Sequence, residues 1–249
     1  MATQVFKIPE SFNKDCKYTF CPGCDHGVAI RLVGEVMDEL GIRENVIGAT
    51  AIGCSVTIYD FLNIDAIESP HGRALAVATG VKRANPEKIV FTYSGDGDFA
   101  SIGIAESLHA GLRGEKITAI CINNTTYGMT GGQCGPTTLV NQVTTTSPYG
   151  RNLDYYGYPI KLAEHFALCD GVAFSARVSL DTIANIKKAK QAIKKAFEIQ
   201  LQGKGFGFVE ILSSCPTNWK MSPQQAHERI RNEMIPIFAP GIYKDVTNL

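Results

Sequence analysis

Two short polar segments of the sequence come directly after apolar runs. Gly95-Asp96-Gly97 follows the run at 88–94, and Asn123-Asn124 follows the run at 116–122. Both runs are rich in β-branched residues and are expected to be strands. A right-handed crossover between parallel neighbours places the ends of such strands side by side. Asp96 and an asparagine would then offer the oxygen ligands that Mg²⁺ prefers.

The glycines and the helix that follows them make this a candidate diphosphate site. Gly95 and Gly97 let a ligand approach the backbone, and a helix expected from about 100 to 113 favours a phosphate at its N-terminus. The alternative is a glycine turn and an asparagine-rich loop that bind no ligand. A Rossmann dinucleotide site fits poorly, because no GxGxxG follows the first expected strand, and no GxxxxGK[ST] occurs.

The eight cysteines form the second group of residues whose side chains could do chemistry. Cys21-Pro-Gly-Cys24 is a CxxC pair, which suits a thioredoxin-like redox site, a zinc site or an iron–sulfur cluster. The polar residues before it disfavour the first, and the other two need two further thiolates. Cys54 and Cys215 follow the expected strands at 45–53 and 206–212, at the same sheet edge as the candidate diphosphate site. Taken alone, the sequence does not separate zinc from iron.

The remaining cysteines fall into two pairs. Cys121 lies inside an apolar strand and Cys169 ends an apolar helix, so both are expected to be small buried hydrophobes. Cys16 and Cys134 lie in expected loops. Either of them could replace one of the four chosen ligands.

Strands and helices are expected to alternate along the chain. The pattern predicts helices at 26–40, 72–84, 100–113, 160–168, 181–202 and 222–234, and strands at 45–53, 88–94, 116–122, 171–178 and 206–212. Such alternation is typical of a doubly wound α/β fold, with a mostly parallel sheet covered on both faces. Ligands of these folds bind beyond the carboxyl ends of the strands. We expect one domain over 1–249, with a long active-site loop at about 124–159 and an extended C-terminal tail from about 235.

Composition and charge narrow the class of protein. Hydrophobic residues make up 45% and charged residues 19%, as in packed globular proteins. The 24 lysines and arginines balance the 24 aspartates and glutamates, so no net field attracts nucleic acid or a membrane surface. No apolar run nears the ~20 residues that a membrane span needs, and the first residues lack the apolar region of a signal peptide. We therefore expect a cytoplasmic protein that binds neither nucleic acid nor a membrane.

Together the two candidate sites give a specific resemblance: the chain resembles the β subunit of the 2-oxoacid:ferredoxin oxidoreductases. The spacing from Gly95 to Asn124 is that of the thiamine-diphosphate-binding fold, and the look is closest to the branched-chain, 2-oxoisovalerate type. The matching motifs are YTFCPGC (18–24), IGCS (52–55), HGRA (71–74), GDGD (95–98), NNTTYGMTGGQ (123–133) and SCPTNW (214–219).

The resemblance implies a set of site residues. A [4Fe-4S] cluster would be held by Cys21, Cys24, Cys54 and Cys215, and Mg²⁺ by Asp96, Asn124 and the main-chain carbonyl of Thr126. His71 would act catalytically beside the cofactor, although a histidine at a helix start is often a simple cap. Thiamine diphosphate would lie against Ile52, Gly53, Cys54, Ser55, His71, Gly95, Gly97, Asp98, Gly128, Met129 and Thr130.

The resemblance also implies an activity and partners. A 2-oxoacid would lose CO₂ on thiamine diphosphate, its acyl group would pass to coenzyme A, and the electrons would pass through the cluster to ferredoxin. Relatives selective for 2-oxoglutarate often carry Lys where Gly131 stands, which weakens the dicarboxylate assignment. The pyrimidine-binding domain would come from a partner α subunit, with accessory ferredoxin-like subunits. The alternatives are a 2-oxoglutarate or pyruvate substrate, a non-redox thiamine-dependent lyase subunit with structural zinc, and a scaffold without activity.

Overall fold

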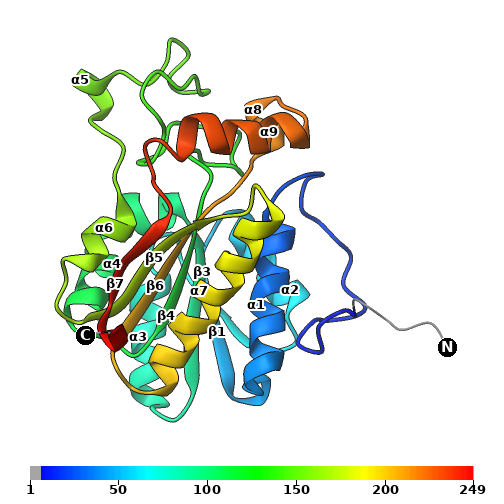
Figure 1. The fold of residues 1–249 in the computed structure, drawn as a ribbon, viewed down its shortest axis with the longest axis vertical. Coiled ribbons are helices and arrows are strands. Elements are labelled where there is room, and N and C mark those ends of the chain that lie inside the picture. The colour runs from blue at the N-terminus through cyan, green and yellow to red at the C-terminus, as the bar shows by residue number, and fades with distance from the viewer. Residues whose placement is uncertain (1–6, 249) are drawn as a thin grey trace.

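A computed structural model describes residues 7–248, which form a seven-stranded sheet with helices on both faces (Figure 1). The strand order is β2-β1-β3-β4-β6-β5-β7, and every neighbouring pair is parallel except β5 and β7. This agrees with the predicted doubly wound α/β fold. The strands are β1 (Val46–Thr50), β2 (Asp65–Glu68), β3 (Ile89–Gly95), β4 (Thr118–Asn123), β5 (Val172–Ser179), β6 (Phe206–Leu212) and β7 (Gly241–Asp245).

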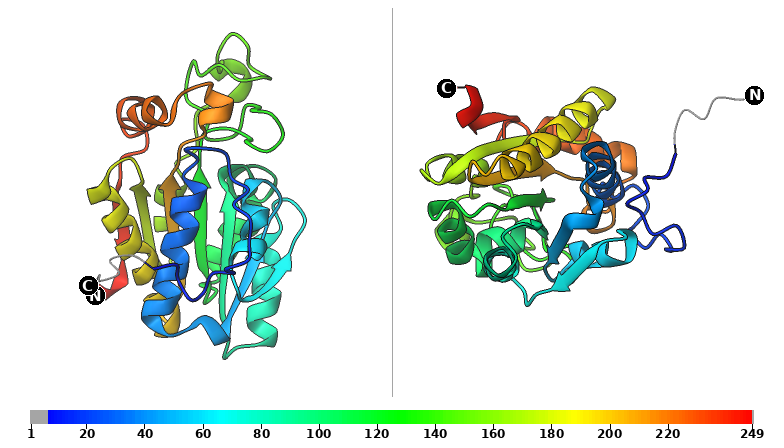
Figure 2. Two further views of the ribbon diagram at one scale, coloured as in Figure 1. Left: turned by 90° about the vertical axis from the view of Figure 1, so that its right-hand side faces the viewer. Right: turned by 90° about the horizontal axis from the view of Figure 1, so that it is seen from below.

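The helices make two layers and a cap. α1 and α7 pack together over one face of the sheet, and α3, α4 and α6 cover the other (Figures 1 and 2). The short helices α8 and α9 and the segment that carries α5 lie above the carboxyl edge of the strands. The helices are α1 (His26–Leu40), α2 (Ile58–Phe61), α3 (Ala74–Ala84), α4 (Ile104–Leu112), α5 (Leu153–Tyr156), α6 (Leu162–Ala167), α7 (Ile183–Leu201), α8 (Pro216–Trp219) and α9 (Pro223–Arg229).

The central strands are buried on both faces, which explains why their sequences are mostly apolar. Alternate side chains of β4 point to opposite helix layers: Ile120 packs with the α1 and α7 layer, and Ala119 and Cys121 pack with the other. Cys121 and Cys169 are both buried in that second layer. Among residues 7–248, no helix is long and apolar enough to cross a membrane.

The structure differs from the predicted elements at the two edges of the sheet. β2 was not predicted, because all four of its residues are exposed and its sequence, DAIE, carries no strand pattern. The segment from about 235, expected as an extended tail, contains β7, which pairs antiparallel with β5. The helix predicted at 222–234 is α-helical only to Arg229 and continues as a π-helix over Ile230–Met234. The conformation of such edge strands depends on their pairing with the neighbouring strand rather than on a local sequence pattern.

A buried ion network joins the centre of the sheet to its edge. The guanidinium of Arg177 is fully buried, contacts Glu210 at 2.9 Å and pairs with both carboxylate oxygens of Glu164. The other oxygen of Glu210 accepts a hydrogen bond from Asn123 Nδ2 at 2.7 Å, directly beside the polar segment at the end of β4. Arg177 also hydrogen-bonds the hydroxyl of Tyr243 on β7. One buried cation therefore links β4, β5, β6 and β7.

Arg177→Met is expected to lower the free energy of unfolding by about 3–5 kcal/mol, because it leaves the buried Glu210 carboxylate without its counter-charge. Urea denaturation of the purified chain measures this. Lys7→Met is the control: Lys7 pairs with Glu10 at 3.1 Å on the open surface, so its loss is expected to change the unfolding free energy by less than about 1 kcal/mol. Equal midpoints for the two variants would contradict the role given to the network.

Candidate functional site

The polar and sulfur-bearing segments converge at the carboxyl edge of the sheet. Gly95 at the end of β3 is in register with Ile122 of β4, and Asn123 of β4 is in register with Leu212 of β6. On the other side, Thr50 at the end of β1 pairs with Tyr93 of β3. The segments that continue from these strands, which include Asp96, Asn124, Cys54 and Cys215, therefore leave the sheet side by side, as predicted.

Asp96 is a buried carboxylate at this edge. It is 3% exposed, accepts a hydrogen bond from the Thr137 hydroxyl, and forms no ion pair with a basic side chain among residues 7–248. Burial raises the pKa of Asp96 to about 7, because a charged carboxylate lacks the compensation that water would give it. A divalent cation would supply that compensation, so the environment of Asp96 fits a magnesium ligand.

The turn after β4 is strained. Thr125 has a φ of 60°, a left-handed conformation that is costly for a β-branched residue. The turn is held by two local bonds, from the Thr125 N–H to Asn123 Oδ1 and from the Thr126 N–H to Asn124 Oδ1, both 3.1 Å. The Thr125 carbonyl also accepts bonds from Thr138 and Gln142. The surrounding loop therefore fixes Asn124 and Thr126 beside Asp96.

His71 is anchored by Asp98. Its Nδ1 lies 2.6 Å from Asp98 Oδ1, and the Gly72 N–H donates to the same oxygen at 2.8 Å. Burial raises the pKa of Asp98, while the bonds from Gly72 and His71 act against that rise. With Nδ1 facing the carboxylate, Nε2 is the imidazole nitrogen available to other groups. Asp98 therefore orients His71 and also lines the candidate diphosphate site.

A cavity of about 170 Å³ collects the predicted cofactor-binding residues. It is lined by glycine backbone at 95, 97 and 128, and Cβ atoms added at Gly53 and Gly95 would meet nothing within 4 Å. A ligand can therefore approach the main chain there, which suits a diphosphate. The predicted residues that line it are Ile52, Gly53, Cys54, Ser55, His71, Gly95, Asp96, Gly97, Asp98, Asn124, Thr126, Gly128, Met129 and Thr130.

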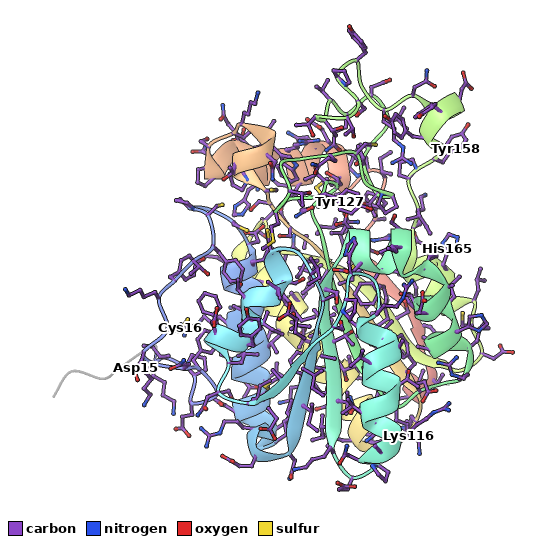
Figure 3. The ribbon with its side chains drawn as sticks, turned by 180° about the vertical axis from the view of Figure 1, so that it is seen from behind. Asp15, Cys16, Lys116, Tyr127, Tyr158 and His165 are labelled. Atoms are coloured by element: carbon purple, nitrogen blue, oxygen red, sulfur yellow. The ribbon has the colours of Figure 1, made fainter. Side chains whose placement is uncertain are left out.

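A second cavity, of about 400 Å³, collects the four chosen cysteines, namely Cys21, Cys24, Cys54 and Cys215. Cys16 and Cys134 are not among its lining residues, and in Figure 3 Cys16 lies on the flank of the molecule beside Asp15, away from Tyr127 at the sheet edge. All eight cysteines are free thiols. In residues 7–248, no three His, Cys, Asp or Glu side chains gather closely enough to hold a single metal ion.

The thiols around this cavity are close enough to influence one another. Burial, together with the neighbouring thiols of Cys215 and Cys54, raises the pKa of Cys24 to about 12, and a backbone hydrogen bond from His26 acts against that rise. Burial likewise raises the pKa of Cys54 to about 11, with contributions from Cys215 and Cys21. Thiols whose pKa is this high need a metal centre to become thiolates. Four cysteines around one cavity are the set of ligands that an iron–sulfur cluster needs.

The two cavities share a wall. The residues common to both are His26, Cys54, Asn124, Gly128 and Met129. A Cβ atom added to Gly128 would lie 3.5 Å from Cys54 Sγ and 3.4 Å from Asn124 Nδ2. One candidate cluster ligand and one candidate magnesium ligand therefore pack against the same glycine, and a diphosphate cofactor and a cluster bound here would be immediate neighbours.

Comparison with known proteins identifies the family. Residues 51–211 match the family described as thiamine pyrophosphate enzyme, C-terminal TPP binding domain. The 2-oxoglutarate synthase subunit KorB of Methanocaldococcus jannaschii is 39% identical over 201 residues, which cover 80% of this chain and 70% of KorB. The chain belongs to the 2-oxoacid:ferredoxin oxidoreductases.

Two further relatives extend the likeness. The ketoisovalerate oxidoreductase subunit VorA of Methanothermobacter thermautotrophicus is 45% identical over 226 residues, or 91% of this chain and 47% of VorA. The chain therefore spans about half the length of that relative. A 2-oxoglutarate:ferredoxin oxidoreductase from Magnetococcus marinus, solved with 2-oxoglutarate, coenzyme A and succinyl-CoA bound, matches with a TM-score of 0.77 at 26% identity, covering 96% of this chain and 85% of that one.

The CxxC loop of this oxidoreductase chain is fastened to the segment that carries Cys215. The carboxylate of Asp25 accepts a bond from the Ser214 N–H at 2.7 Å and lies 2.9 Å from His227 Nε2 on α9. The Ser214 hydroxyl donates to the Gly23 carbonyl at 2.7 Å. The hydrogen bond to Asp25 raises the pKa of His227, which strengthens the pairing. Two chain segments almost two hundred residues apart are thus held together by these hydrogen bonds.

Four residues of the site were not predicted individually. His26 is buried between the cavities, where its Nδ1 lies 2.9 Å from the Tyr93 hydroxyl and burial lowers its pKa to about 4. Thr137 bonds Asp96, Tyr127 lines the smaller cavity, and Asn218 bonds Cys215. Tyr127 and Asn218 lie inside motifs that the sequence does contain. Thr137 carries no local signal at all.

Asp98→Asn is expected to lower the affinity for thiamine diphosphate by less than about tenfold, since an amide can still accept the bonds from Gly72 and His71 but without the charge. Titration calorimetry at saturating Mg²⁺ measures it. A loss of more than about 100-fold, which is what we expect when a direct ligand of the cation is removed, would mean that Asp98 holds the cation, contrary to the assignment.

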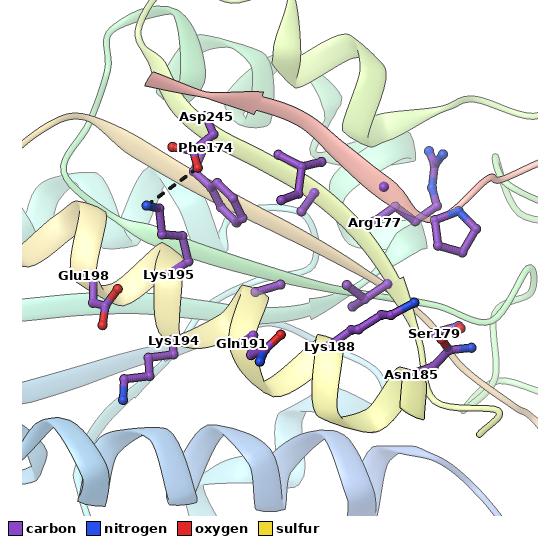
Figure 4. Close-up of a pocket in the computed structure, with 16 residues that line it drawn as sticks. Phe174, Arg177, Ser179, Asn185, Lys188, Gln191, Lys194, Lys195, Glu198 and Asp245 are labelled. Carbon is purple, nitrogen blue, oxygen red and sulfur yellow. Dashed lines mark ion pairs between the residues drawn. The ribbon is translucent and has the colours of Figure 1, made fainter. Parts of the chain in front are cut away.

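A third cavity lies elsewhere in the oxidoreductase chain. This groove of about 560 Å³ runs between α7 and strands β5 and β7, where Lys195 and Asp245 form an ion pair of 3.6 Å across it (Figure 4). None of its lining residues belongs to the predicted site.

Proposed function

We propose that this chain is the thiamine-diphosphate-binding β subunit of a 2-oxoacid:ferredoxin oxidoreductase. The enzyme would convert a 2-oxoacid and coenzyme A to acyl-CoA and CO₂ and pass the electrons singly to ferredoxin. The observation that carries the proposal is the wall shared by a glycine-lined cavity beside a buried carboxylate and a cavity lined by four cysteines. A cofactor that releases electrons and a cluster that accepts them need such proximity.

In this proposal the chain holds both groups with its own residues. Asp96, Asn124 and the Thr126 carbonyl would bind Mg²⁺, and the glycine backbone at 53, 95, 97 and 128 would receive the diphosphate. Thiamine diphosphate supplies the electron sink for decarboxylation when bound. His71, oriented by Asp98, would present Nε2 beside it to move or hold a proton. Cys21, Cys24, Cys54 and Cys215 would bind a [4Fe-4S] cluster.

We infer a branched-chain 2-oxoacid as substrate. Met129 is 51% exposed and lines both cavities, so it offers an apolar surface to a substrate side chain. Gly131 leaves open space where a Cβ would meet nothing within 4 Å, and no lysine stands there to pair with a second carboxylate. The likeness to the ketoisovalerate oxidoreductase subunit VorA supports the same class. The alternative is 2-oxoglutarate, which the likeness to KorB favours.

We further propose that the chain works with partners. A separate α subunit would supply the pyrimidine-binding domain, and ferredoxin-like subunits would carry electrons onward. The relatives are themselves named as subunits. Eight free thiols suit a reducing compartment, so we propose a cytoplasmic location.

The proposal is tested on the purified complex with a panel of 2-oxoacids and metal analysis of the same sample. We expect coenzyme A-dependent ferredoxin reduction that is fastest with 2-oxoisovalerate, together with four irons per chain beyond any in accessory subunits. Zinc in place of iron, with CO₂ release but no ferredoxin reduction, would instead indicate the non-redox lyase. Full turnover by this chain alone, loaded with cofactors, would disprove the shared active site.

A further inference from the structure

Asn218 lies where the two cavities meet and contacts both sides. Its side-chain Nδ2 donates to Cys215 Sγ at 3.2 Å and to the Gly128 carbonyl oxygen at 2.8 Å. One amide group thus touches a candidate ligand of the cluster and the loop that lines the candidate cofactor cavity.

The position of this amide is fixed from several directions. Asn218 lies on α8, one turn after Cys215, and the Trp219 N–H closes that turn onto the Cys215 carbonyl at 3.0 Å. A Cβ atom added to Gly132, whose φ is +82°, would lie 3.0 Å from Asn218 Oδ1. The loop therefore needs a glycine at 132 in order to close over the amide. Such packing leaves the side chain little freedom to turn away from the sulfur.

The amide acts on the electrostatics of the sulfur. The side-chain N–H of Asn218 is directed at the Cys215 sulfur, with Nδ2 at 3.2 Å from Sγ. Donors aimed at a sulfur favour negative charge there. A reduced iron–sulfur cluster carries one more negative charge than the oxidised cluster, so N–H groups directed at its ligands raise its reduction potential.

We propose that Asn218 is a positioning residue that sets the reduction potential of the cluster and at the same time holds the cofactor loop at Gly128. This rests on the proposed function, since it requires a cluster on Cys215. The two effects share one group, so one substitution changes both. Removing the amide lowers the potential and also releases the Gly128 carbonyl from its partner.

The test uses the whole purified complex carrying Asn218→Leu, which removes both side-chain donors at similar volume. An EPR-monitored redox titration is expected to give a midpoint more negative than that of the wild type. Calorimetry is expected to show affinity for thiamine diphosphate reduced several-fold. Asn218→Asp, which puts a negative charge in place of the donor, is expected to lower the midpoint further. Gln224→Leu is the matched control: it replaces an exposed amide on α9 that donates to Glu228 at 3.3 Å, and we expect it to leave both values unchanged.

The possible outcomes distinguish a failure of the proposed function from a failure of the role given to Asn218. Wild-type complex without iron on this chain would overturn the proposed function. Clusters present in both variants with wild-type midpoints would overturn the role of Asn218 alone. Loss of iron from both variants while Gln224→Leu retains it would also overturn it, because Asn218 would then serve retention of the cluster and not its potential.

Discussion

Cys215→Ser is expected to abolish ferredoxin reduction while a slow, single release of CO₂ remains. Cys215 lies on the segment that follows β6 and lines the sulfur-lined cavity together with Cys21, Cys24 and Cys54, whose thiols interact with it electrostatically. Serine cannot replace the thiolate that an iron–sulfur cluster needs. The candidate cofactor cavity does not include Cys215, so decarboxylation keeps its residues. Iron content, visible absorbance and single-turnover CO₂ release of the mutant complex measure the two halves separately.

Cys169→Ser is the control for this substitution. Cys169 is buried in the helix layer formed by α3, α4 and α6, where its Sγ lies 3.7 Å from the His165 carbonyl. It lines neither of the two site cavities. We expect it to keep the full iron content and lose only packing energy. A full four-iron complement in Cys215→Ser would refute the ligand assignment and turn attention to Cys16 or Cys134.

Asp96→Ala is expected to weaken the binding of thiamine diphosphate by more than about 100-fold, because substitutions of mere supporting residues around metals already cost 10–100-fold. Asp96 is the carboxylate that the structure buries beside Asn124 and Thr126, and a neutral methyl cannot hold the cation. Calorimetry at saturating Mg²⁺ gives the value. Wild-type affinity in Asp96→Ala would remove the magnesium assignment.

A stability measurement separates this loss from misfolding. The pKa of Asp96 in the folded protein, about 7, is above the usual value of 3.8, so the folded state binds more protons than the unfolded chain between these values. Without a cation, the stability of the wild type should therefore fall as the pH rises from about 4 to 7. Asp96→Ala removes this dependence and should unfold no earlier than the wild type at pH 8. If Asp96→Ala were less stable than the wild type at pH 8, the lost affinity would be explained by a damaged fold.

The central strands and the site edge could be predicted because their signals are local. β3, β4 and β6 are buried on both faces, so their sequences are mostly apolar. Parallel strands then place the residues after Gly95, Asn123 and Leu212 at one edge, which is why the cysteines and the Asp96 segment fell together as expected. The spacing of the CxxC pair can be read from the sequence. That the pair lies near Cys215 could not be, because it depends on the hydrogen bonds that Asp25 makes with Ser214 and His227.

The remainder depends on contacts between distant segments. β2 and β7 take their conformation from pairing with β1 and β5, and β2 carries no apolar pattern of its own. Thr137 reaches Asp96 across forty-one positions through a loop without periodicity. Asn218 reaches the Gly128 carbonyl across ninety positions of the chain. None of these pairings leaves a trace in a single sequence.

The most direct test of the account is to mix the purified complex anaerobically with 2-oxoisovalerate and coenzyme A, without ferredoxin, and to follow the cluster by EPR. We predict that a reduced [4Fe-4S] signal appears, that it depends on thiamine diphosphate, and that it is missing in Cys215→Ser. Release of CO₂ by the wild-type complex with no change in the state of any cluster on this chain would contradict the account.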